Sequence, residues 1–177
     1  PYPILSGLVG SEMCIRDRLQ KYLNKEIALK VLTKSRIGEI SELESLKNNM
    51  QIKLDVKFVD RKSLSHEISS FNLLGFCLKE NYSVQASMPT KIGEVLACGV
   101  PLICNAFNED IKNLVWENEV GLIYNFEEPL LDERLSELFK LIDDPETSLK
   151  CIDTAKKYFS LDKGSEKYNH LYFKFIE

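Results

Sequence analysis

The chain has 177 residues, 44% of them hydrophobic and 28% charged, which suits one globular domain with a hydrophobic core. Its formal net charge of −4 argues against a basic surface that would bind nucleic acid. No apolar run approaches the roughly 20 residues that a membrane span needs. The five cysteines form no C-x-x-C pair, which is typical of free thiols in a reducing cytoplasm.

The first 18 residues look foreign to the rest of the chain. Residues 8–18 read LVGSEMCIRDR, which resembles an in-frame translation of a transposase sequencing adapter. We therefore interpret residues 1–18 as an artefactual leader, with adapter sequence over about residues 7–18, and expect this leader to lie outside the fold. The globular domain then spans residues 19–177. We expect that an N-terminal domain precedes it in the natural protein and is missing from this chain.

Strand and helix patterns alternate from residue 27 onward. Residues 52–58 alternate strictly between apolar and charged side chains, which predicts a strand near a sheet edge, whereas the apolar run 73–78 predicts a strand covered on both faces. The expected strands are residues 27–32, 52–58, 73–78, 102–104 and 121–124, and the expected helices are residues 37–49, 63–71, 89–98, 110–116, 130–142, 145–159 and 162–176.

This alternation predicts an α/β fold with a Rossmann-like parallel sheet, helices on both faces and a helical C-terminal tail. In such sheets, ligands bind beyond the carboxyl ends of the strands. The sequence therefore places a candidate site in three loops, residues 33–36, 79–90 and 105–110.

The helix expected to begin near Pro89 has two distinct faces. One face carries Ile92, Val95 and Leu96 at helical spacing and should be buried. The other face carries polar side chains one turn apart, namely Thr90, Lys91 and Glu94.

The polar face can bind a phosphorylated ligand. The free amides at the helix start, capped by Ser87 or Thr90, together with Lys91, suit an anion. Glu94 lies a turn deeper, where its carboxylate can accept hydrogen bonds from vicinal hydroxyls. This arrangement suits the diphosphate and ribose of a nucleotide, while a solvated surface ion pair between Lys91 and Glu94 remains the alternative interpretation.

Residues 87–105 match the pattern S-x-P-T-K-x-x-E-x-L-A-x-G-x-P-[LV]-I-x-N at every fixed position. This stretch resembles the signature of family 4 glycosyltransferases of the bacterial surface-polysaccharide type. The resemblance implies a single C-terminal domain of GT-B architecture that binds a nucleotide-sugar, with Glu94 holding the ribose hydroxyls. An earlier glutamate of the family motif falls at Ala86, so Ser87 or the loop backbone would have to contact the sugar instead.

The resemblance also implies a basic pair after the first strand, for which Lys34 and Arg36 are the candidates, with ordinary loop charges as the alternative. Asn105 and Asp110 follow a later strand, although Asp110 could instead cap the next helix. The complete set of donor-binding candidates is Lys34, Arg36, Ser87, Pro89, Thr90, Lys91, Glu94, Asn105 and Asp110. No catalytic residue is assigned, and no metal or other cofactor is expected because the loops contain no Asp-x-Asp motif.

The function implied by the resemblance is transfer of a sugar, with retention of configuration, from a UDP- or GDP-sugar to an acceptor glycan or lipid. The acceptor would enter from the side of the missing N-terminal domain, so this fragment alone should be inactive. A nucleotide-sugar 2-epimerase of the same fold and a non-catalytic nucleotide- or partner-binding domain are the alternatives. We expect a cytoplasmic protein, with contact to the inner face of the plasma membrane made only through the missing domain.

Overall fold

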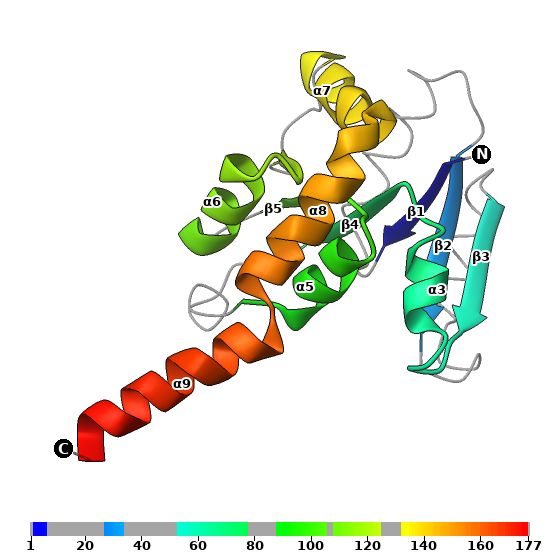
Figure 1. Cartoon of the computed structure of the whole chain (residues 1–177). Helices are drawn as coiled ribbons and strands as arrows, with labels where there is room; N and C mark the ends of the chain where they lie inside the picture. Colours follow the sequence, from blue (N-terminus) through cyan, green and yellow to red (C-terminus); the bar gives the residue numbers. More distant parts are fainter. Residues whose placement is uncertain are drawn as a thin grey trace.

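The computed structural model describes residues 2–6, 27–33, 53–77, 88–105, 108–124 and 132–176. Within these ranges, six parallel strands form one sheet in the order β3-β2-β1-β4-β5-β6 (Figure 1). The strands are β1 (Tyr2–Ser6), β2 (Ile27–Thr33), β3 (Lys53–Phe58), β4 (Leu73–Cys77), β5 (Leu102–Asn105) and β6 (Gly121–Ile123). The helices are α3 (Leu64–Ile68), α5 (Thr90–Ala97), α6 (Glu109–Glu117), α7 (Asp132–Asp143), α8 (Pro145–Tyr158) and α9 (Leu161–Ile176).

This strand order confirms the predicted α/β class and the Rossmann-like parallel sheet. The chain fills one half of the sheet from β1 outward to β3, and then fills the other half from β4 to β6. The direction of winding therefore reverses between β1 and β4, and such a reversal opens a crevice at the carboxyl ends of the two central strands. The helix expected at residues 37–49 lies outside the described residues.

The start of the chain departs from our expectation. Tyr2–Ser6 forms β1, which pairs in parallel with β2 on one side and with β4 on the other. The expectation that residues 1–18 lie outside the fold is therefore wrong for this strand, because its backbone links the two halves of the sheet. Residues 7–18 lie outside the described ranges, so the adapter origin of this segment stays a prediction.

Both faces of the central strands are covered. Leu102 and Cys104 of β5 belong to a buried cluster that also contains residues of α5, α6 and α8, while Ile103 points to the opposite face and is equally buried. By contrast, β3 is an edge strand on which Asp55 and Lys57 are exposed. The continuous and the alternating patterns in the sequence thus correctly distinguish central from edge strands.

The helix α5 packs against α8, which crosses over it in Figure 1. Gly99, in the turn after α5, has a φ of 75°, a left-handed conformation that glycine adopts without strain. Asp144 caps α8 by accepting a hydrogen bond from the Glu146 amide at 2.9 Å.

Beyond α8, α9 extends away from the other described elements (Figure 1). In the described part of the chain, no helix is both long and apolar enough to cross a membrane.

An ion triad ties α3 to the edge of the sheet. Glu67 of α3 accepts hydrogen bonds from Lys30 of β2 at 2.7 Å and from Lys57 of β3. The Lys30 ammonium also lies 5.5 Å from the centre of the Phe71 ring. Lys30 and then Lys57 lower the pKa of the Glu67 carboxyl to about 2.

The triad predicts an acid-sensitive contribution to stability. Because the pKa of Glu67 is depressed on folding, its stabilising effect is present above the unfolded-state value near 4.5 and is lost as pH falls towards 2. Replacing Glu67 by Gln should therefore flatten the pH dependence of the urea midpoint between pH 5 and 2. The control is Glu137→Gln, which removes an exposed carboxylate of α7. Identical slopes in the wild type and Glu67→Gln would contradict this role.

Candidate functional site

The strands that precede the three predicted loops all end at one edge of the sheet. Because all six strands are parallel, the carboxyl ends of β2, β4 and β5 lie at the same edge of the sheet, together with the turn that follows β3. The helix α5 begins there at Thr90, and Asn105 ends β5 there. The topology therefore gathers the central motif and its neighbours where ligands of such sheets bind.

The two faces predicted for α5 are both present. Ile92, Val95 and Leu96 are buried with exposed fractions of 2% or less. Lys91 and Glu94 are exposed on the other side of the helix. The apolar face thus fixes the helix against the core, and this packing orients Lys91 and Glu94 outward.

The start of α5 differs from our expectation. Its N-cap is Pro89, which makes no side-chain capping hydrogen bond, and Thr90 is already the first helical residue, so Thr90 is not the cap. The Ile92 amide donates to the Pro89 carbonyl at 3.0 Å. No acidic side chain lies in the first turn, so the positive end of the helix dipole is not neutralised from within the helix.

Glu94 faces a cation that the sequence did not suggest. Its Oε1 lies 4.0 Å from Nη2 of Arg61, in the segment between β3 and α3. The Glu94 side chain is 45% exposed and the Arg61 side chain 85%. Among the described residues, the ion pair of Glu94 is with Arg61, so the alternative of a surface pair between Lys91 and Glu94 is not observed. No local pattern links residues 61 and 94, and only the fold brings them together.

Two further candidates lie at the same edge in different environments. Asn105 is buried at the end of β5, with 9% exposure. Asp110 is exposed in the first turn of α6. The N-cap of α6 is Asn108, whose side chain accepts a hydrogen bond from the Asp110 amide at 2.7 Å. The alternative that Asp110 caps this helix is therefore wrong.

The remaining candidates are Lys34, Arg36 and Ser87, all of which lie outside the described residues, so their roles stay predictions. In the part of the chain that the structure describes, no group of three or more potential metal-binding side chains is found. Burial raises the pKa of the Cys98 thiol, and the nearby negative charge of Glu94 raises it further. This thiol is therefore held protonated and is a poor nucleophile.

A cavity of about 260 Å³ lies at the opposite edge of the sheet, where β4 and β5 begin. Its walls come from the segments before these strands and from the junction of α7 and α8. The lining residues are Ser69, Phe71, Asn72, Cys98, Gly99, Val100, Pro101, Leu141, Ile142, Asp143, Asp144, Pro145, Thr147 and Ser148. None of the donor-binding candidates in the described ranges lines this cavity, so it is separate from the predicted site.

Comparisons with known proteins leave the family open. No protein-family model matches the chain, and no similar sequence is found among curated proteins. One solved structure, assigned as a UDP-N-acetylglucosamine 2-epimerase from Listeria monocytogenes, aligns with a TM-score of 0.48 and 13% identity. The alignment covers 94% of this chain but only 46% of that protein, so the chain spans about half of its length. A likeness of this degree assigns no function.

Proposed function

We propose that this chain carries the donor-nucleotide half of a family 4 glycosyltransferase of GT-B architecture. The supporting observation is that the motif of residues 87–105 coincides with α5 and β5, and that α5 starts at the carboxyl edge of the sheet. Leu96, Leu102 and Ile103, three of the fixed apolar positions of the motif, are buried, whereas its Lys91 and Glu94 are exposed at that edge. The full enzyme would transfer a sugar from a UDP- or GDP-sugar to an acceptor glycan or lipid, with retention of configuration.

The residues of α5 have separate roles in this proposal. The diphosphate is the leaving group, and its growing negative charge is stabilised by Lys91 and by the amides at the start of α5. Lys34 and Arg36 are proposed to add positive charge from the loop after β2. Glu94, one turn into α5, accepts hydrogen bonds from the ribose hydroxyls.

The proposed partner is an acceptor-binding domain that would form the other half of a GT-B enzyme. The helix α9 supports this partner because it extends from the body (Figure 1) and exposes apolar side chains at helical spacing. Tyr168, Leu171 and Tyr172 are 68%, 50% and 66% exposed. Apolar side chains gathered on one helix face are typical of a surface covered by another domain.

Titration and turnover assays test this proposal. We expect the 177-residue chain to bind UDP or GDP weakly in calorimetry, but to show no sugar transfer because the acceptor side is absent. Adding an intact N-terminal half from a related family 4 enzyme should produce transfer to a glycan or lipid acceptor. Binding of neither nucleotide, or transfer by the 177-residue chain alone, would contradict the proposal.

The same assay separates the two enzymatic interpretations. A 2-epimerase interconverts nucleotide-sugars without any acceptor, so its product retains the nucleotide. A glycosyltransferase releases the nucleoside diphosphate, and this release depends on the acceptor. Epimerised nucleotide-sugar in the absence of acceptor would favour the epimerase, and nucleotide binding without either reaction in the two-domain protein would favour a binding domain.

A further inference from the structure

The turn between β3 and α3 holds Arg61 at the carboxyl edge of the sheet. Val59, just after β3, is buried and anchors the start of the turn. Asp60 accepts a hydrogen bond from the Ser63 amide at 2.8 Å, and this bond lowers the pKa of the Asp60 carboxyl. The turn is therefore fixed at both ends, and Arg61 projects from a defined position rather than from a loose loop.

The contact between Arg61 and Glu94 is too weak to be a structural tie. At 4.0 Å, between side chains that are 85% and 45% exposed, an ion pair contributes little to folding. The guanidinium carries five N–H donors in a planar fork, and Glu94 occupies this fork only loosely. With 85% of the Arg61 side chain exposed, most of its hydrogen-bonding capacity remains open to solvent beside Glu94.

We infer that Arg61 binds the nucleoside of the donor, with its guanidinium lying against the ribose and the base beside Glu94. This inference rests on the proposed function. Lys91 lies one turn nearer the start of α5 than Glu94, on the side proposed for the diphosphate, whereas Arg61 meets Glu94 itself. A planar guanidinium stacks on an aromatic ring and also donates to ring hydroxyls, and both groups are present in a nucleoside.

A ligand series with Arg61→Gln tests this role by calorimetry. We expect affinity for the nucleoside diphosphate that binds the wild-type chain, UDP or GDP, to fall about ten-fold. Affinity for the corresponding nucleoside monophosphate should fall by a similar factor, while binding of inorganic pyrophosphate should stay unchanged. Arg61→Lys should recover less than half of the affinity that Arg61→Gln loses, because lysine restores the charge but not the planar fork.

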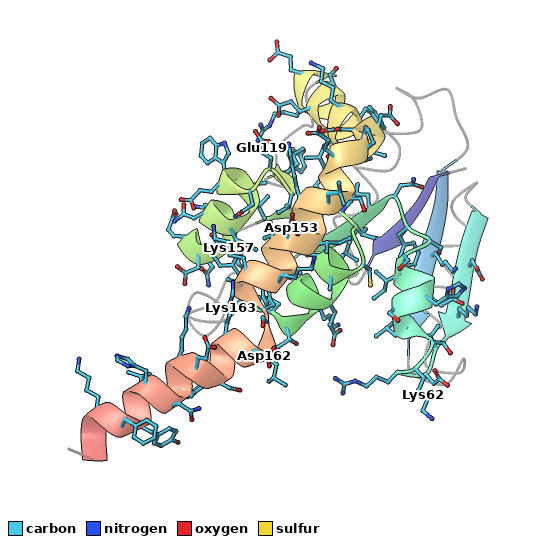
Figure 2. All side chains as sticks on the ribbon, viewed as in Figure 1. Lys62, Glu119, Asp153, Lys157, Asp162 and Lys163 are labelled. Carbon is cyan, nitrogen blue, oxygen red and sulfur yellow. The ribbon has the colours of Figure 1, made fainter. Side chains whose placement is uncertain are left out.

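Lys62 provides the matched control. It is exposed on the same turn, and Figure 2 shows it pointing outward below α3. Lys62→Gln removes the same charge one residue away and should leave nucleotide affinity unchanged. Equal losses for Lys62→Gln and Arg61→Gln, or a loss of pyrophosphate binding by Arg61→Gln, would show a general charge effect and overturn the inference.

The outcomes also separate this inference from the proposed function. If the wild-type chain binds neither UDP nor GDP, the proposed function itself fails. If it binds one of them and Glu94→Gln weakens that binding while Arg61→Gln does not, only the role of Arg61 fails. Tighter nucleotide binding by Arg61→Gln would show that Arg61 competes with the ligand for Glu94, and would equally overturn the inference. Thermal melts of both Arg61 variants are expected to match the wild type, because the pair with Glu94 is exposed.

Discussion

Replacing Glu94 by Gln is expected to weaken the binding of UDP or GDP about 10- to 100-fold. The reason is that hydrogen bonds to a charged carboxylate are worth about 1.5–3 kcal/mol, more than those to a neutral amide. Glutamine has nearly the same shape and remains on the exposed face of α5, so the helix should pack as before. The expected loss therefore reports on the ligand rather than on the fold.

Isothermal calorimetry with UDP, GDP and pyrophosphate measures this effect. Pyrophosphate affinity should change little, because Glu94 is proposed to hold the ribose and not the phosphates. Glu117→Gln, at an exposed position of α6, is the matched control and should bind all three ligands like the wild type. Unchanged nucleotide affinity in Glu94→Gln would contradict the proposed role of Glu94 in donor binding, independently of the result for the Arg61 variants.

Local sequence patterns predicted the elements around this site well. The spacing of Ile92, Val95 and Leu96 correctly gave both the buried and the exposed face of α5. The expected helix at residues 89–98 and the expected strand at residues 102–104 likewise agree with α5 and β5 to within one residue at each end. Such features depend on neighbours within a few residues, so a short stretch of sequence contains the information that determines them.

Features that depend on long-range contacts were missed. Arg61 and Glu94 meet only because the sheet brings the segment after β3 next to α5, and nothing near either residue indicates this. The place of Tyr2–Ser6 in the sheet was overlooked because the adjoining adapter-like sequence suggested that the whole leader was foreign. At the start of α6, Asn108 and Asp110 are both residue types that cap helices, so composition alone could not decide between them.

Gly93 links the motif to the end of α8, and its replacement by Ala should destabilise the chain. A Cβ at this position would lie 2.6 Å from Cγ and Cδ1 of Phe159 and 2.8 Å from its Cβ. Phe159 packs on the main core cluster, and its amide bonds the Ala155 carbonyl at 2.8 Å, so it cannot move away freely. Overlap of this kind costs about 1–3 kcal/mol, against which the better helix propensity of alanine returns up to about 1 kcal/mol.

Urea unfolding measures the net loss, and Gly164→Ala is the matched control. Gly164 lies in α9, where an added Cβ meets no atom within 4 Å, so alanine should leave stability unchanged or raise it slightly. Combining Gly93→Ala with Phe159→Ala should cost less than the sum of the two single changes, because the second removes the obstruction. Simple additivity would show that the overlap is relieved elsewhere.

The same substitution tests how the core controls the candidate site. Gly93 is flanked by Ile92, which is buried, and by Glu94, which is exposed at the edge of the sheet. If Phe159 pushes α5 outward, the carboxylate of Glu94 moves with the helix, and misplacement of a hydrogen-bonding group lowers affinity even in folded molecules. We therefore expect folded Gly93→Ala to bind UDP or GDP more weakly, and the Phe159→Ala background to restore part of this binding. Wild-type affinity in Gly93→Ala would mean that α5 keeps its position and that the overlap is absorbed by α8 alone.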